Sequence, residues 1–430
     1  MPCVARAPAV LGNWTSASGG SSVIAMALDA PYPDSRISLY VAVVLLPSFR
    51  QPKWQGAGRQ WCEQSRRLKI SPAPLLLSRR RAGASPSGLR EKHMKLRTLA
   101  IALSCIIAGL PALALDLTSL RAAAAYSAAH RGVSMLVMQN GRRVFEDYPN
   151  GHSADEPHKI YSGTKAFWNL CALAATEDGL LSLDERVGDS VPEWNADARK
   201  SRITVRQLLD FSCGLDPGFP LHRDDPGDRN RIALQLPLVA SPGQAFIYGP
   251  SALQVFHEVL KRKLSARGQT PTGYLEGRVL RPLGLGAQRY MADSAGNPLL
   301  ASGWKLTARE WAKMGQVALN GGAPVLSRVP LSIGLRGSPV NRAFAFGWWN
   351  NRAAPGGREF DIEDMLEPKW FRQDWRSTVI SRGAPADLMA SIGSGYQRLF
   401  VIPSMSLVVV RQGLGGKFSD SEYLRLLLGK

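Results

Sequence analysis

The sequence contains few of the residues on which many hydrolytic and metal sites depend. Only 6 of its 430 residues are histidine, and none follows His257. The G-x-S-x-G elbow that presents the serine of many Ser-His-Asp proteins is absent. The H-E-x-x-H pattern of zinc proteases is absent as well. The sequence therefore gives little support to a histidine-based triad and predicts no metal site.

Cysteine is also scarce. The chain has 5 cysteines, of which only Cys171 and Cys213 follow residue 114. An oxidising compartment would permit a disulfide between these two residues. Two separate buried thiols are the other interpretation, and the sequence alone leaves both open.

Acidic residues are outnumbered, since 53 Lys and Arg against 34 Asp and Glu leave a formal net charge of +19. Residues 1–93 hold 13 basic and 4 acidic residues, and residues 94–114 add two more basic ones. Residues 115–430 hold 38 basic and 30 acidic residues, so about half of the excess charge lies before them. No basic run is interleaved with aromatic residues, and we expect no nucleic-acid partner.

The apolar run at residues 99–110 is too short to span a bilayer comfortably. It follows Lys95 and Arg97, and it precedes Pro111 and an A-x-A sequence at residues 112–114. This order is typical of a secretory signal peptide.

We therefore predict a signal peptide at residues 94–114 and export to the periplasm or the medium. Met94 is then the expected start, and residues 1–93 are an upstream extension without structure. Residues 115–430 are the mature folded domain, with no stable membrane span.

Strand patterns occur near both ends of residues 115–430. Residues 133–139 and 142–147 flank Asn140-Gly141, a pair typical of a type I′ hairpin. QRLFVIP (397–403) and SLVVVRQ (406–412) predict a second strand pair close to the C-terminus.

Helices are predicted between and around these strands, and one long helix begins near Ser162. Capping residues are expected at Thr204, at Ser251 with Gln254, at Thr307 with Glu310, and at Ser419 with Glu422. The order of elements predicts an α/β fold of the α+β type. An antiparallel sheet is built from both chain ends and flanked by helices, with a mainly helical region inserted.

Ser162 and Lys165 lie three residues apart at the start of this long apolar helix. Residues i and i+3 share a helix face, so the lysine amine would lie beside the serine hydroxyl. Burial lowers the pKa of a lysine, and a neutral amine can take the proton of the serine. The same spacing at Ser302 and Lys305 falls in a loop that leads into a predicted helix. A polar pair at a helix end, without catalytic function, is the alternative for both.

Four segments carry a resemblance to a known family. They are YSGTKAFWNLCALAATEDGLLSLDERV, ITVRQLLDFSCGL, SPGQAFIYGPSALQVFHEVL and SIGSGYQRLFVIPSMSLVVVRQG. With them, nearly all of residues 115–430 resembles the class C β-lactamase-related serine hydrolases. This group includes D-alanyl-D-alanine carboxypeptidases, esterases and aminohexanoate-dimer hydrolases. The resemblance implies a β-lactamase/transpeptidase-like fold, a small-molecule ester or amide substrate and no cofactor.

Three residues match the catalytic positions of that family. The resemblance makes Ser162 the acylated nucleophile and Lys165 its base. Tyr248 falls at the position of the tyrosine that carries a proton to the leaving group. We expect the charge of Lys165 to lower the pKa of Tyr248 so that the phenol can do this.

Two residues depart from the family's pattern. Pro250 replaces the asparagine of the Tyr-x-Asn motif, and Ser394 stands where a Lys/His-x-Gly motif has its cation. A substrate carboxylate would lose a charge-assisted hydrogen bond there. We therefore expect an esterase or amidase rather than an efficient β-lactamase.

The substrate strand is expected to comprise Gly393, Ser394, Gly395, Tyr396 and Gln397. A backbone N–H from residues 395–397 would join the N–H of Ser162 in an oxyanion hole. A non-catalytic protein that binds a peptidoglycan-type ligand is the alternative function, with the two departures marking lost turnover.

Aromatic residues are concentrated at residues 344–375. They could line an apolar substrate pocket near Pro250 or pack in the core, and the sequence favours neither interpretation. These residues are Trp348, Trp349, Trp370, Phe371 and Trp375.

Overall fold

The computed structural model describes residues 23–24, 44–45, 115–351, 357–359, 361–365 and 375–430. The chain divides into two units, Met1–Met94 and Lys95–Lys430. In the first unit the two-residue strands β1 (Val23–Ile24) and β2 (Val44–Leu45) pair antiparallel. The rest of the predicted upstream extension and the whole predicted signal peptide lie outside the described residues.

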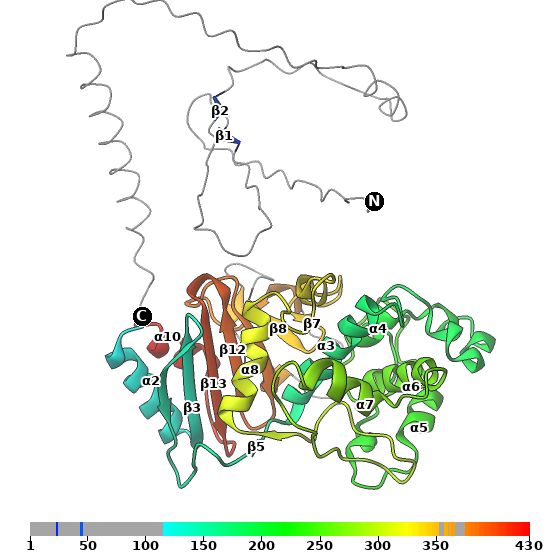
Figure 1. The fold of residues 1–430 in the computed structure, drawn as a ribbon, viewed down its shortest axis with the longest axis horizontal. Coiled ribbons are helices and arrows are strands. Elements are labelled where there is room, and N and C mark those ends of the chain that lie inside the picture. The colour runs from blue at the N-terminus through cyan, green and yellow to red at the C-terminus, as the bar shows by residue number, and fades with distance from the viewer. Residues whose placement is uncertain (1–22, 25–43, 46–114, 352–356, 360, 366–374) are drawn as a thin grey trace, which may run out of the picture. The chain divides into compact units, whose positions relative to one another are not determined.

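A seven-stranded antiparallel sheet forms the centre of the second unit (Figure 1). Its strand order is β4-β3-β13-β12-β11-β8-β7. The strands are β3 (Gly132–Gln139), β4 (Arg142–Asp147), β7 (Phe344–Ala345), β8 (Trp348–Asn350), β11 (Met389–Gly393), β12 (Gln397–Ile402) and β13 (Leu407–Gly413). Because β3 pairs with β13, the sheet joins both ends of this unit, which confirms the predicted fold class.

The predicted hairpin is present between β3 and β4. Gln139 lies opposite Arg142, and the two residues between them, Asn140 and Gly141, have φ angles of 52° and 73°. A type I′ turn requires positive φ at both central residues, and Asn-Gly is the pair that adopts it most readily.

Helices cover both faces of the sheet. Figure 1 shows α8 (Ala308–Leu319) on one face, and α2 (Leu117–Ala129) with α10 (Asp420–Leu427) on the other. Gly315 lets α8 approach closely, because a Cβ there would lie 2.4 Å from a side-chain carbon of Val408 on β13. Helix α2 is alanine-rich with little hydrophobic periodicity, so the sequence pattern does not predict it.

The inserted helical region and shorter elements complete the unit. They are α3 (Thr164–Glu177), α4 (Val205–Leu209), α5 (Arg229–Gln235), α6 (Ser251–Ser265), α7 (Pro271–Leu275), α9 (Ile362–Met365), and the two-stranded pairs β5 (His158–Lys159) with β6 (Lys305–Leu306) and β9 (Arg358–Glu359) with β10 (Thr378–Val379). In Figure 1, α3 runs between the sheet and the helices α4 to α7.

Three of the four predicted helix caps are confirmed. Thr204 and Thr307 each form a complete capping box, and the side chain of Ser419 accepts the N–H of Glu422. The prediction of a capping box at Ser251 with Gln254 is wrong. Pro250 has helical backbone angles and is the N-cap, so the Ser251 hydroxyl lies inside the helix and donates to the carbonyl of Asp216.

Cys171 and Cys213 are both buried and free, so the interpretation as two separate thiols is confirmed. Burial raises the pKa of both thiols, which keeps them protonated and unreactive. Within the described part of the chain, no helix is both long and apolar enough to cross a membrane.

Candidate active site

Ser162 lies in a tight 3₁₀ turn, Tyr161–Gly163, that leads directly into α3. Tyr161 has a φ of 45°, an unfavourable backbone conformation for a bulky residue. The turn is held by the Thr164 hydroxyl, which donates to the Tyr161 carbonyl at 2.7 Å. It is also packed closely, since a Cβ on Gly163 would lie 2.6 Å from Trp311 of α8. These contacts fix the direction in which the serine hydroxyl points.

Lys165 lies one turn further along the same helix face and is 2% exposed. Its Nζ lies 2.8 Å from Ser162 Oγ and donates to the carbonyl of Ala301 at 2.9 Å. Burial lowers the pKa of Lys165 to about 7. No charged partner contributes to this shift. Near neutral pH a large fraction of the amine is therefore uncharged and can accept a proton from Ser162.

Tyr248 completes the cluster. Lys165 Nζ lies over its ring, 4.6 Å from the centroid, and its hydroxyl hydrogen-bonds with Ser162. The expectation that Lys165 lowers the pKa of Tyr248 is wrong. Burial raises that pKa well above its usual range, and this effect exceeds the opposing hydrogen bond with Ser162. The amine faces the ring rather than the oxygen, so at neutral pH the phenol is a protonated hydrogen-bond donor.

The predicted substrate strand is divided between two strands and a turn. Gly393 ends β11 and Gln397 begins β12, so Ser394, Gly395 and Tyr396 form the turn between them. Ser394 is exposed at its tip. Gly393 lies so close to the nucleophile turn that a Cβ there would lie 2.0 Å from the Ile160 carbonyl oxygen.

Three buried side chains hold this turn through its carbonyl groups. Gln397 Nε2 donates to the carbonyls of Ser394, Gly395 and Gly413, at 3.3, 2.9 and 2.7 Å. Arg398 donates to the Gly393 and Gln397 carbonyls, and Arg411 donates to that of Tyr396. The Gln397 amide is therefore engaged within the protein and is not presented to a substrate.

Arg398, on β12 directly after this turn, does not replace the missing cation. Its side chain is fully buried, and Nε donates to Asp420 at 2.7 Å. Its other nitrogens lie 3.5 Å from Asp361 and 4.0 Å from Glu363. Asp420 is thus the close counter-charge, and burial raises the pKa of the neighbouring Asp361 to about 7. The guanidinium is engaged within the protein and is not available to a substrate carboxylate.

The turn also directs its backbone donors away from the serine. The N–H of Tyr396 donates to Glu363 at 3.2 Å, and Gly395 makes a second backbone hydrogen bond to this carboxylate. The edge of β11 is closer to Ser162, since the Ser391 hydroxyl donates to the Gly163 carbonyl at 3.5 Å. Strand β8 pairs with β11 only at Met389 and Ala390, so the rest of that edge faces the nucleophile turn.

The tryptophans of the predicted pocket are core residues. Trp348 and Trp349 are 3% and 1% exposed, and the ring of Trp349 lies 6.1 Å from that of Tyr248. The ring of Trp375 lies 5.4 Å from that of Trp349, tilted by 37°, whereas Trp370 and Phe371 lie outside the described residues. Pro250 is also buried, at the start of α6. Of the two predicted interpretations, core packing around Tyr248 is the one observed.

Two cavities flank Tyr161, the residue before the serine. One, of about 260 Å³, is lined by Lys159, Tyr161, His222, Met291, Leu299, Ser302, Gly303 and Trp304. The other, of about 300 Å³, is lined by His158, Tyr161, Ser394, Gly395, Gln397, Gly413, Leu414 and Gly415. The first cavity could not be predicted from the sequence, because its walls come from four separate segments that only the folded chain brings together beside Tyr161.

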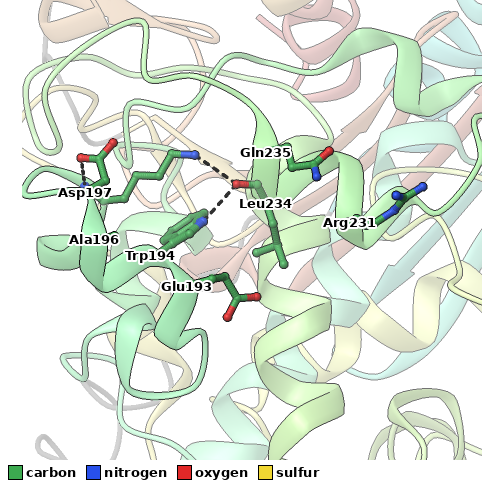
Figure 2. A pocket seen from close by; sticks show the side chains of 8 residues that line it. Glu193, Trp194, Ala196, Asp197, Arg231, Leu234 and Gln235 are labelled. Atoms are coloured by element: carbon green, nitrogen blue, oxygen red, sulfur yellow. Dashed lines mark hydrogen bonds between the residues drawn. The ribbon is translucent and has the colours of Figure 1, made fainter.

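A further cavity of about 470 Å³ is lined by none of these residues (Figure 2). There the amine of Lys200 and the indole N–H of Trp194 both donate to the Leu234 carbonyl, each at 3.0 Å. The cavity offers no serine or lysine free to react. The described residues also contain no group of three or more His, Cys, Asp or Glu side chains that could hold a metal ion.

The fold and this cluster define an α+β protein with a serine, a buried lysine and a buried tyrosine in contact at a helix start. The family model described as Beta-lactamase matches residues 119–412, and the chain belongs to this family of hydrolases.

Curated relatives match over shorter stretches. Protein flp of Staphylococcus aureus (strain NCTC 8325 / PS 47) is 25% identical over 169 residues, 35% of this chain and 33% of that protein. Monacolin J acid methylbutanoyltransferase of Aspergillus terreus is 31% identical over 159 residues, which are 30% of this chain and 37% of that protein. The aligned part spans only about a third of the length of these relatives.

Solved structures show the same fold. A putative beta-lactamase from Bacteroides dorei aligns with a TM-score of 0.54 and 16% identity, over 74% of this chain and 100% of that one. An octameric penicillin-binding protein homologue from Pyrococcus abyssi aligns with a TM-score of 0.53 and 19% identity, over 74% of this chain and 78% of that one.

Proposed function

We propose that this protein is an exported serine hydrolase that cleaves an ester or amide through an acyl-enzyme on Ser162. One observation carries the proposal: Lys165 Nζ lies 2.8 Å from Ser162 Oγ, and burial lowers its pKa to about 7. A serine is a weak nucleophile until a base removes its proton. A neutral buried amine at hydrogen-bond distance is such a base.

Acylation follows from the contacts of the cluster. Lys165 takes the hydroxyl proton as Ser162 Oγ attacks the substrate carbonyl carbon, and the carbonyl oxygen becomes an oxyanion. Tyr248, which is protonated at neutral pH, gives its proton to the leaving alcohol or amine as the bond to carbon breaks. The proton held by Lys165 then returns to Tyr248, and the acyl group remains on Ser162 as an ester.

Deacylation uses the same groups in the reverse order. A water molecule gives a proton to the amine of Lys165 through Tyr248 and attacks the acyl carbon. The acid leaves, and Ser162 recovers its proton. The oxyanion needs backbone donors, which we assign to the N–H of Ser162 and to the edge of β11 beyond Ala390. Successive N–H groups of a strand point to opposite sides, so at least one in residues 391–393 points away from β12.

The substrate preference follows from the missing cation. Ser394 is exposed at the turn tip, and Arg398 is engaged by Asp420 and lies near Asp361 and Glu363. Arg398 is therefore not available to a carboxylate bound beside the β11–β12 turn, and that carboxylate would meet the carboxylate of Glu363 nearby. We propose esters or amides without an anion on that side as substrates, in preference to β-lactams.

Active-site labelling tests the proposal. A fluorophosphonate should label the wild-type protein once, on Ser162, and mass spectrometry of the digested protein should find no label on Ser302. Ser162→Ala should abolish labelling, whereas Ser265→Ala, at an exposed helix end, should retain it. A protein that stays unlabelled, and that hydrolyses neither p-nitrophenyl esters nor aminohexanoate dimer, would instead support the non-catalytic binding function.

A further inference from the structure

The 260 Å³ cavity beside Tyr161 adjoins the nucleophile on two sides. Tyr161 precedes Ser162, and Ser302 follows Ala301, whose carbonyl binds the amine of Lys165. A substrate whose carbonyl reaches Ser162 can therefore extend one of its two ends into this cavity. At about 30 Å³ for each water-sized group, the cavity holds roughly eight or nine non-hydrogen atoms.

One lysine lines this cavity, and a second lies opposite it on a small sheet. Lys159 lines it, and β5 pairs with β6 so that Lys159 lies directly opposite Lys305. Residues directly opposite in an antiparallel pair project from the same face, so the two ammonium groups share one side. Like charges in this position are unfavourable without a counter-ion.

Neither lysine has an anionic partner among the described residues. The carboxylates on neighbouring segments are engaged elsewhere. Glu156 pairs with His152 at 3.0 Å, and Asp293 accepts the backbone N–H groups of Arg229 and Asn297. The positive charge at this end of the site is thus uncompensated, whereas the β11–β12 side carries the carboxylate of Glu363.

We propose that this cavity binds a carboxylate-bearing end of the substrate, with Lys159 and Lys305 as its counter-charges. Met291, Leu299 and Trp304 supply the apolar wall for a short methylene chain, and the lysines lie where its anionic end emerges. The inference rests on the proposed hydrolysis at Ser162 and adds a substrate class to it: esters or amides of small dicarboxylic acids, or of an alcohol or amine that carries a carboxylate.

Three matched esters test the charge preference. They are p-nitrophenyl butyrate, which is neutral, mono-p-nitrophenyl glutarate, with the anion on the acyl side, and 3-carboxy-4-nitrophenyl butyrate, with the anion on a nitrophenol leaving group. Wild type should show the higher kcat/KM for one of the two anionic esters, and this preference should decrease as salt is added. The preferred ester shows which end of the substrate enters the cavity.

The double variant Lys159→Gln with Lys305→Gln should lose about tenfold in kcat/KM for the preferred anionic ester, mainly through a higher KM. Its kcat/KM for the neutral ester and its fluorophosphonate labelling should change little. Lys313→Gln, at a half-buried lysine of α8 that does not line the cavity, removes one positive charge elsewhere and should keep the preference.

The outcomes separate the two proposals. If wild type hydrolyses the neutral ester but neither anionic ester better, or if the double variant keeps the preference, the anion site is refuted while Ser162 hydrolysis stands. If wild type hydrolyses none of the three esters and is not labelled, the hydrolase proposal itself fails.

Discussion

Burial of Lys165 should destabilise the fold, and Lys165→Met tests this directly. The folded protein holds the pKa of this amine at about 7, against its ordinary 10.5. Such a difference corresponds to about 5 kcal/mol of unfavourable free energy when the lysine is charged in both states. Methionine has a similar length and no charge. It leaves the Ala301 carbonyl without its donor, which costs about 1–3 kcal/mol.

The sign of the effect should depend on pH. Below about pH 7 the variant avoids the whole burial cost and should be about 2–4 kcal/mol more stable than wild type. From about pH 7 to about pH 10.5 the unfolded lysine holds a proton that the folded one lacks, so wild-type stability rises with pH. Near the upper end the advantage of the variant should disappear and reverse.

Urea unfolding of both proteins across this pH range measures the difference. An advantage that stays constant from neutral to alkaline pH would refute the assignment of an unusually low pKa to Lys165. Activity gives an independent check on the same amine. Wild-type kcat/KM for p-nitrophenyl butyrate should rise with pH through about 7, since only the neutral amine accepts a proton. A flat profile there would contradict its role as the base.

Three further predictions concern the rest of the site. Tyr248→Phe should slow deacylation more than acylation, so that mass spectrometry detects a longer-lived acyl-enzyme; wild-type turnover would mean that another group moves this proton. Wild type should hydrolyse a neutral butyrate ester with a higher kcat/KM than a cephalosporin, and Ser394→Lys should narrow the gap by about tenfold. Gly393→Ala should lower kcat at least tenfold, because a Cβ 2.0 Å from the Ile160 carbonyl must displace β11. Gly286→Ala, where a Cβ meets nothing within 4 Å, is its control, and equal activity of the two variants would contradict the reasoning.

Features that depend on neighbouring residues could be predicted from the sequence. The hairpin at Asn140-Gly141 follows from backbone preferences of two residues, and the capping boxes at Thr204 and Thr307 close within four residues. The contact between Ser162 and Lys165 also lies within one helical turn. In each case the partners are close in sequence, so the local pattern contains the information.

Features that depend on distant residues could not be predicted. Ser251 fits a capping pattern, but its hydroxyl finds the Asp216 carbonyl at 2.6 Å instead. The pKa of Tyr248 depends on how deeply the ring is buried, and the engagement of Arg398 depends on carboxylates from α10 and the segment before α9. Likewise, no local pattern in the sequence indicates that the side chain of Gln397 donates to three carbonyl groups.

The pairing of β3 with β13 also determines when this sheet can form during synthesis. Ser134 on β3 hydrogen-bonds to Gln412 on β13, 278 residues later. At about 5–20 residues per second, a nascent chain spends on the order of ten seconds to a minute with the β13-facing edge of the apolar β3 unpaired. No fragment that ends before β13 can complete the sheet. The two ends of the folded unit nevertheless meet, since α2 packs on α10 and a Cβ on Gly429 would lie 2.9 Å from the Ser119 hydroxyl. A short linker could therefore join the two ends. In a circular permutant opened at the exposed turn 265–269, β13 and β3 would be synthesised almost consecutively. The delay between the synthesis of these two strands would then be much shorter than in the natural chain.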